Sequence, residues 1–416
     1  MEKRHESALE IIDGLQTEIK QIAKTIWELK ETGFEEFKSA KLLCDFLEKN
    51  GFILTRGLTG QDVQAGCPYE MPTAFIADFD SGKKGPVIGL LLEYDALSNG
   101  HACGHNLIAA SGIAAAVAIQ GFLKTGAGRL RVYGTPAEET STAKQFIFDG
   151  GHMGDVDVFF TTHGGSFWST EFAAKAMVAA KYPTCLSIKG KAAHASRSPH
   201  QGRSALDAAM LTGMGIEFLR EHVLETDRMH YAILSGGEAA NVVPESAKMD
   251  LILRANDSNE LNLLMARLDD IIHGAELMTH TKAEYKWDTP LLAPKKAFAL
   301  YHFTKEAGIA LGLPNTAFIA NLPADVSTDA GNIAYQKPLA FITFPASEKD
   351  TPPLHTDEFA EAAATDYAIS NGILAGKMMA LAAMRLYDSP EALADILSDF
   401  NKKQPLEEIA CLKMSL

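Results

Sequence analysis

The chain has 416 residues, of which 47% are hydrophobic and 22% are charged, and this near-average composition excludes the disordered and fibrous classes. Its 38 Lys and Arg residues against 53 Asp and Glu residues give a formal charge of −15, which disfavours nucleic acids and anionic membranes as partners. At this length we expect two domains.

The first part of the chain alternates helical and strand-like patterns. Apolar residues at helical spacing predict two helices between residues 6 and 50. A later apolar stretch, 107–123, is rich in Ala and Gly and contains Ser111 and Gln120, which favours a buried helix over a membrane span. Short apolar runs bounded by Gly and Pro predict strands at 73–79, 86–92, 130–133 and 156–162. This alternation predicts an α/β fold, a three-layer domain with a mostly parallel sheet.

The pattern changes near Cys185. The order becomes strand, helix, strand, strand, helix, strand, which is typical of a ferredoxin-like α+β domain. After residue 290 the α/β alternation resumes with a helix at 298–311 and a strand at 339–344. We therefore predict an inserted domain at 184–290 within a larger domain made of 1–183 and 291–416. The elements predicted in the insert are 184–189, 204–222, 231–234, 249–254, 258–273 and 283–287.

The cysteines and the N-terminal sequence bear on the compartment. Five cysteines, odd in number and widely scattered, differ from the dense even sets of disulfide-stapled secreted domains. Residues 1–6 lead into a charged amphipathic pattern without an apolar signal region. We expect a reducing compartment and a cytoplasmic protein.

Side chains that bind metal ions follow several of the predicted strands. In an open, mostly parallel sheet the loops at the carboxyl ends converge, so these side chains are expected to lie close together. Imidazole, thiolate and carboxylate groups suit zinc or a similar divalent ion. The candidates are Asp95, His101, Cys103 and His105 after 86–92, Glu138 and Glu139 after 130–133, His163 after 156–162, and His355 after 339–344.

Each of these candidates has a plainer explanation. A Cys-Gly-His tripeptide often occurs by chance, and a lone histidine at a strand end commonly bonds a backbone carbonyl. Adjacent acids such as Glu138 and Glu139 usually form solvated surface. Here they follow a buried strand and a Gly-Thr-Pro turn, where like charges are costly unless a cation or a shared proton relieves them. The joint occurrence of the candidates favours a metal centre with one acidic ligand and one general base.

Eight motifs occur in order along nearly the whole chain: Glu31–Glu36, Glu93–Leu97, Gly100–Asn106, Gly134–Glu139, Lys189–Ala195, Asn241–Pro244, Ser327–Asn332 and Leu354–Thr356. In order and spacing they resemble metallopeptidase family 20, a family of dinuclear metal enzymes that includes aminoacylases, carboxypeptidase G and hippurate hydrolases. The motifs are most similar to its branch of acyl-amino-acid and dipeptide hydrolases.

The resemblance implies a metal centre and a general base. Glu138 would take a proton from a water molecule whose pKa the metal ions lower to about 7, and would return it to the leaving nitrogen. Cys103 would bridge two divalent ions, which could be Zn, Mn or Co. The implied ligands are Cys103, His105, Glu139, His163 and His355.

The resemblance also makes the inserted domain a lid and dimerisation domain with substrate-binding residues. His194 would steady the oxyanion in the active site of a partner subunit, although it could equally be an ordinary loop histidine. Asn241 would orient the substrate. Arg254 would bind a substrate carboxylate, unless it pairs with a structural acid such as Asp257 or Glu260. Gly331 would let the backbone approach the substrate, although a plain turn is the common use of glycine.

One position departs from the commoner pattern of the family. Asn106 stands where many indole-acetyl-amino-acid and hippurate hydrolases carry Asp, and an amide cannot give His105 the support of a negative charge. Asp95 could supply that charge instead.

We therefore predict a homodimeric, two-metal amidohydrolase that cleaves an N-acyl amino acid, a dipeptide or an aminobenzoyl-amino-acid-type substrate. One alternative is a deaminase or aminohydrolase that attacks an aromatic or amidine carbon and releases ammonia without an amino acid. A second alternative is a non-catalytic ligand-binding relative, which the intact Glu138 and the full ligand set disfavour.

Overall fold

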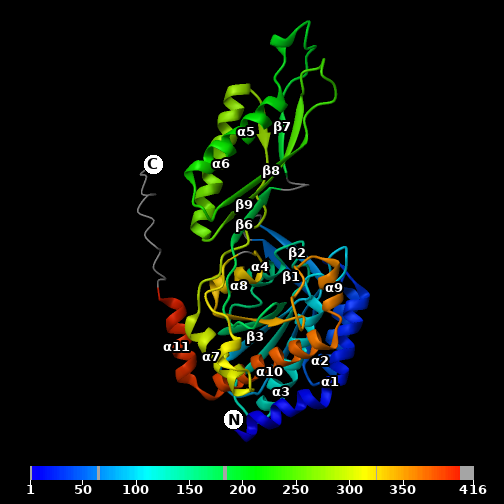
Figure 1. The fold of residues 1–416 in the computed structure, drawn as a ribbon, viewed down its shortest axis with the longest axis vertical. Helices are drawn as coiled ribbons and strands as arrows, with labels where there is room; N and C mark the ends of the chain where they lie inside the picture. Colours follow the sequence, from blue (N-terminus) through cyan, green and yellow to red (C-terminus); the bar gives the residue numbers. More distant parts are fainter. Residues whose placement is uncertain (1, 63–65, 181–184, 325, 403–416) are drawn as a thin grey trace. The chain divides into compact units, whose positions relative to one another are not determined.

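The computed structural model describes residues 2–62, 66–180, 185–324 and 326–402. The chain divides into two compact units (Figure 1). The large unit comprises Met1–Phe172, Pro294–Pro323 and Asn332–Leu416, and the small unit comprises Ala173–Ala293 and Ala324–Gly331. These bounds differ from the predicted insert at 184–290, because the small unit starts earlier and also contains the later segment 324–331.

The large unit contains a six-stranded sheet made of β1 (Ile53–Asp62), β2 (Cys67–Asp80), β3 (Val87–Leu92), β4 (Arg129–Gly134), β5 (Val158–Gly165) and β11 (Leu339–Pro345). The strand order is β1-β2-β4-β3-β5-β11. The pairs β4-β3, β3-β5 and β5-β11 are parallel, whereas β1 and β2 are antiparallel additions at one side. The carboxyl ends of β3, β4 and β5 therefore open at the same edge of the sheet.

Helices with apolar faces cover this sheet. The central one is α3 (His105–Leu123), which packs against α1 (Lys3–Leu29), α10 (Asp366–Asp388) and β5. By length and composition α3 could cross a membrane, but 94% of its apolar window is buried, as expected for a core helix. Gly376 of α10 allows the close approach of α3, since a Cβ there would lie 2.5 Å from the carbonyl oxygen of Ser111. The remaining helices are α2 (Phe37–Lys49), α4 (Ala143–Asp149), α7 (Phe298–Ala310), α9 (Asp357–Ala362) and α11 (Pro390–Asn401), and α8 (Ala330–Gln336) begins in the small unit.

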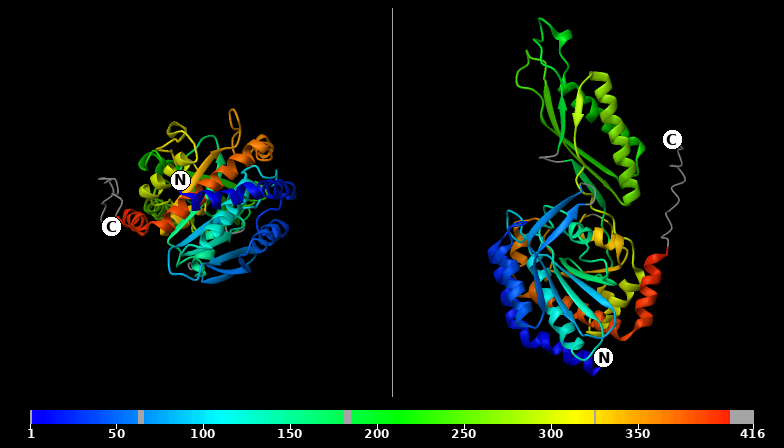
Figure 2. Two further views of the ribbon diagram at one scale, coloured as in Figure 1. Left: turned by 90° about the horizontal axis from the view of Figure 1, so that it is seen from below. Right: turned by 180° about the vertical axis from the view of Figure 1, so that it is seen from behind.

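The small unit is an antiparallel sheet with helices on one face (Figure 2). Its strands are β6 (Ala176–Ala180), β7 (Leu186–Lys189), β8 (Arg228–Ser235), β9 (Ser246–Ala255) and β10 (Lys282–Glu284). The order β10-β7-β9-β8 is the ferredoxin-like order, and β6 extends the sheet by pairing with the second half of β9. Alternate residues of β9 are buried beneath α5 (Ala205–Leu219) and α6 (Ser258–Thr279).

The predicted fold class is confirmed, and two strands were missing from the prediction. β1 contains Gly57 and Gly60 among polar residues, so its alternating burial is hard to recognise in the sequence. β6 is a short Ala-rich run without β-branched residues on both sides. Residue 184, the first of the predicted strand 184–189, and Cys411 lie outside the described residues.

Candidate metal centre

The loop after β3 presents Cys103 and His105 at the carboxyl edge of the sheet. Gly104 lies between them with φ 78°, a left-handed conformation that glycine adopts without strain. A Cβ at this position would also lie 3.1 Å from the ring of Phe359. The glycine thus allows the sharp turn that directs two consecutive candidate ligands to one place before α3 begins.

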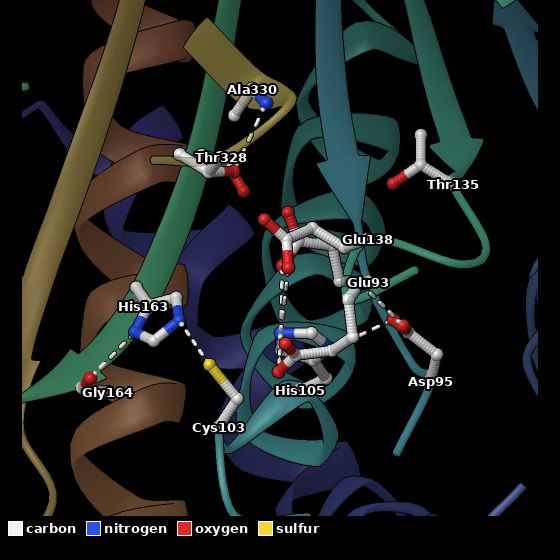
Figure 3. A network of polar contacts seen from close by, with 12 residues as sticks. Glu93, Asp95, Cys103, His105, Thr135, Glu138, His163, Gly164, Thr328 and Ala330 are labelled. Atoms are coloured by element: carbon white, nitrogen blue, oxygen red, sulfur yellow. Dashed lines mark hydrogen bonds and ion pairs between the residues drawn. The ribbon is translucent and has the colours of Figure 1, made fainter. Parts of the chain in front are cut away.

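Potential ligand atoms gather in three groups, in each of which all atoms lie within 4.8 Å of one another. Cys103 belongs to the first two groups, and its Sγ lies 3.4 Å from Nε2 of His163 (Figure 3). All five ligands implied by the sequence occur in those two groups. The groups are Cys103, His105 and His163; Cys103, Glu139 and His355; and Glu93, His105 and Glu138.

Asp95 orients His105. Its Oδ1 lies 2.8 Å from His105 Nδ1, and both side chains are buried. Burial lowers the pKa of His105, but the Asp95 carboxylate outweighs burial and raises it well above its ordinary value. Asn106 takes no part in this contact, because its Nδ2 donates to the carbonyl of Ala363 at 2.9 Å. Asp95 thus has the position to supply the charge that Asn106 cannot.

The turn after β4 carries Glu138 and Glu139. Ala137, immediately before them, is left-handed with φ 57°, which is uncommon for a residue with a Cβ. The amide of Glu139 donates to Asp95 Oδ2 at 3.1 Å, so Asp95 holds both this turn and His105. Oε2 of Glu138 and Oε1 of Glu139 each lie 3.9 Å from His105 Nε2.

A buried ion pair adjoins the same cluster. Lys144, at the start of α4, is completely buried, and its Nζ lies 2.8 Å from Oε1 of Glu93. The other oxygen of Glu93 lies 3.4 Å from His105 Nε2. Burial opposes the charge on Glu93, but Lys144 and the neighbouring histidines hold the pKa of Glu93 below its ordinary value. The carboxylate is therefore kept ionised beside the candidate ligands.

His355 comes from the loop after β11. Its backbone is left-handed with φ 68°, and its amide donates to the carbonyl of Ala102 at 2.8 Å. Its Nε2 lies 3.6 Å from Oε1 of Glu139, and 57% of its side chain is exposed. A strained backbone fixed by a specific hydrogen bond is typical of a side chain whose direction matters.

The donor set fits divalent metal ions. His105 Nε2 and Glu139 Oε1 are buried and have no hydrogen-bond partner among the described residues, although buried polar atoms are nearly always paired. Burial raises the pKa of the Cys103 thiol, whereas a neighbouring cation favours the thiolate. Burial and the charge of His105 lower the pKa of His163, which favours the neutral imidazole that binds metal.

The remaining predicted site residues belong to the small unit. His194 is exposed and lies beside Val242, and the amide of Ala195 donates to the carbonyl of Asn241. His194 and Asn241 are thus neighbours. Arg254 lies near the other end of β9, and the amide of Gly331 donates to the carbonyl of Thr328.

Arg254 has an unusual environment for an arginine. It is half-buried, and burial lowers its pKa. Its Nη1 donates to Ser327 Oγ at 3.1 Å. Within the described residues it forms no ion pair, so the alternative of pairing with Asp257 or Glu260 does not occur there.

Sequence reasoning did not find Glu93, Lys144 or Glu36 as residues of the centre. Glu93 directly follows a buried strand, which is the same signal that identified Glu138. A buried lysine in a short helix leaves no comparable signal. Trp168 and Phe344, two aromatic residues near the predicted site, pack against each other in the core with ring centroids 6.2 Å apart.

Comparisons with known proteins agree with this geometry. A family model described as a peptidase dimerisation domain matches residues 185–276. The chain is 34% identical to a p-aminobenzoyl-glutamate hydrolase of Escherichia coli over 88% of both chains, and 30% identical to human Xaa-Arg dipeptidase over 96% of this chain and 92% of the relative. The fold is also that of a dinuclear metal binding peptidase of the M20 family from Bacillus subtilis, with a TM-score of 0.65, 19% identity, and coverage of 90% of this chain and 99% of that one. The chain therefore belongs to metallopeptidase family 20, and it is a metal-dependent hydrolase of amide bonds.

Proposed function

We propose that the chain holds two divalent ions and hydrolyses the amide bond of a substrate whose leaving group is an amino acid. The five proposed ligands fall into two groups that share Cys103, and this sharing supports Cys103 as the bridge. Divalent ions bound there would lower the pKa of a water molecule and polarise the substrate carbonyl. Zn, Mn and Co all suit the mixed thiolate, imidazole and carboxylate donors.

Glu138 is the proposed general base and acid. The observation that carries this role is its position next to Glu139, at the rim of the ligand cluster and 3.9 Å from His105 Nε2. Its carboxylate would accept a proton from the attacking water and donate it to the leaving nitrogen. Glu139, the adjacent residue, would remain a ligand.

Arg254 is proposed to bind the carboxylate of the substrate. A half-buried guanidinium without an acidic partner within the described residues has lost hydration that a carboxylate would replace with charge-assisted hydrogen bonds. The segment that contains Ser327 and Gly331 lies beside it in the small unit. Asn241 is proposed to orient the substrate as well. The substrate class is therefore an N-acyl amino acid, a dipeptide or an aminobenzoyl amino acid, and the named relatives act on members of it.

We further propose that the protein is a homodimer in the cytoplasm, joined through the small unit. α5 exposes 53% of Met210, 51% of Met214 and 68% of Phe218, and together with Tyr231 and Ile233 of β8 these residues line a hollow of about 250 Å³. β8 pairs only with β9 within the described residues and is thus an edge strand. A contiguous apolar face beside a free strand edge suits a second copy of the chain.

His194 supports the same assembly. It lies beside Val242, before β9 begins at Ser246, whereas Arg254 is near the end of that strand. Eight residues of strand span roughly 26 Å, which is too far for one small substrate to contact both side chains of one copy. His194 of one subunit is therefore proposed to serve the substrate bound by Arg254 of the other.

The base role is tested with Glu138→Gln. We expect the variant to keep the metal content of the unmodified protein while turnover falls by at least about a thousandfold, the upper part of the range for a positioned acid or base. The assay follows release of the amino acid from p-aminobenzoyl-glutamate, Xaa-Arg dipeptides and N-acyl amino acids, with Zn, Mn and Co supplied separately. Loss of metal from a folded variant would make Glu138 a ligand, and release of ammonia alone would point to the deaminase alternative.

Dimer complementation tests His194. Glu138→Gln and His194→Ala should each be inactive, but an equal mixture refolded together should recover roughly a quarter of the original rate, because half of random dimers are mixed and each contains one intact site. A mixture as inactive as its components would exclude sharing between subunits.

A further inference from the structure

Glu36 is a buried carboxylate without a role in the proposed function. It lies in the motif Glu31–Glu36 between α1 and α2, and its side chain is completely buried. One oxygen accepts from the backbone amide of Ala137 at 2.9 Å, and the other accepts from the hydroxyl of Thr73 at 2.9 Å. The amide bonded by Glu36 thus belongs to the residue immediately before Glu138.

The backbone at Ala137 needs such support. Left-handed φ costs a residue with a Cβ about 1–2 kcal/mol, so the turn keeps this conformation only if its surroundings enforce it. The carbonyl of Ala137 accepts from the amide of Ser141 at 2.9 Å. Gly33 lies against the same turn, where an added Cβ would come within 2.4 Å of Thr140 Oγ1 and 3.0 Å of the Ala137 Cβ.

The two ends of the Glu138–Glu139 turn are therefore held by different acids. Asp95 accepts from the amide of Glu139, after Glu138, and Glu36 accepts from the amide of Ala137, before it. Loss of the Asp95 contact would disturb a proposed ligand as well as the turn. Loss of the Glu36 contact would release only the end that precedes Glu138.

We propose that Glu36 is a positioning residue which, through the amide of Ala137, fixes the carboxylate of Glu138 for proton transfer. This inference rests on the proposed base role of Glu138. It assigns a task to the motif Glu31–Glu36, in which Gly33 allows the close approach and Glu36 provides the acceptor. The required property is an oxygen acceptor of the right length, so glutamine should replace glutamate.

The test compares Glu36→Leu, which removes the acceptor at similar volume, with Glu36→Gln, which keeps it. For Glu36→Leu we expect kcat to fall by roughly 10- to 100-fold, since a displacement of about 1 Å can cost 100-fold, with KM and metal content unchanged. Glu36→Gln should retain kcat within about threefold. Glu35→Leu is the matched control, because Glu35 is the neighbouring acid and is exposed; it should behave like the unmodified protein.

A double-mutant cycle separates positioning of Glu138 from a general loss of structure. If Glu36 acts through Glu138, Glu36→Leu should have little further effect on the residual rate of Glu138→Gln. If Glu36→Leu does not fold, Gly33→Ala tests the same turn, because its Cβ would displace Ala137, and it should lower kcat with metal retained.

Three results would overturn the proposal: an unchanged kcat in Glu36→Leu or its Gly33→Ala substitute, an equal loss in Glu36→Gln, or an equal further loss in the Glu138→Gln background. Failure of the proposed function is distinguishable, because Glu138→Gln would then keep its turnover whatever happens at Glu36.

Discussion

Replacement of Lys144 by Met tests the electrostatics of the centre most directly. The variant keeps the apolar length of the side chain but leaves the Glu93 carboxylate, which is 3% exposed, without the ammonium group 2.8 Å away. Removing one partner of a buried ion pair costs about 3–5 kcal/mol, because the remaining charge stays desolvated. We expect a loss of this size in the free energy of unfolding, measured by urea denaturation after metal has been removed with a chelator.

The loss should be smaller when metal is present, since a divalent ion near Glu93 would neutralise the charge that Lys144 no longer balances. Lys189→Met is the matched control. Its partner Glu284 lies at 2.7 Å, but both side chains are more than 60% exposed, so the cost should stay within about 1 kcal/mol. Equal losses in the two variants, or a Lys144→Met loss that metal does not reduce, would refute the reasoning.

Three further predictions concern the residues around Asp95. Asp95→Asn removes the charge beside His105 Nδ1 and should weaken metal affinity by about 10- to 100-fold, as measured by competition with a chromogenic chelator. Burial raises the pKa of Glu36 from 4.5 to about 7, so the folded chain binds more protons than the unfolded chain between these values, and the contribution of Glu36 to stability falls as the pH rises through them. The unfolding free energy of the unmodified protein relative to Glu36→Gln should therefore fall by on the order of 3 kcal/mol from pH 4.5 to 7 in urea titrations, and a constant difference would contradict it. Asn106→Asp places a carboxylate against the carbonyl of Ala363 in place of the amide donor and should destabilise the protein by about 1–3 kcal/mol in thermal unfolding, whereas a gain in metal affinity without that loss would show that residue 106 supports His105 directly.

The sequence predicted the layered α/β unit and the ferredoxin-like insert because hydrophobic periodicity and Gly or Pro boundaries mark most of their elements. It also predicted that Cys103, His105, Glu139 and His163 gather, since parallel strands bring their carboxyl ends together. Periodicity could not reveal β1, a polar and glycine-containing edge strand. Nor could it assign residues 324–331 to the small unit, because that depends on contacts distant in sequence, such as the one between Arg254 and Ser327.

The residues that sequence reasoning missed share a physical cause. Glu36 and Lys144 are charged residues that local patterns place at the surface, yet both are fully buried. Their partners, Ala137 and Glu93, are distant in sequence, so only the folded chain shows that the burial is compensated. Such pairs are costly unless they are complete, and in this chain they occur beside the residues with proposed chemical roles.

The balance of charge at the centre gives these buried groups a common explanation. Glu93, Asp95, Glu138, Glu139 and a Cys103 thiolate together carry as many negative charges as Lys144 and two divalent ions carry positive ones, provided that the histidines are neutral. Without metal the same groups repel one another, and His105 takes up a proton instead, as its raised pKa indicates. Binding of metal should therefore release protons, and Lys144 lets the centre reach neutrality with two ions although it contains one carboxylate more than they could balance.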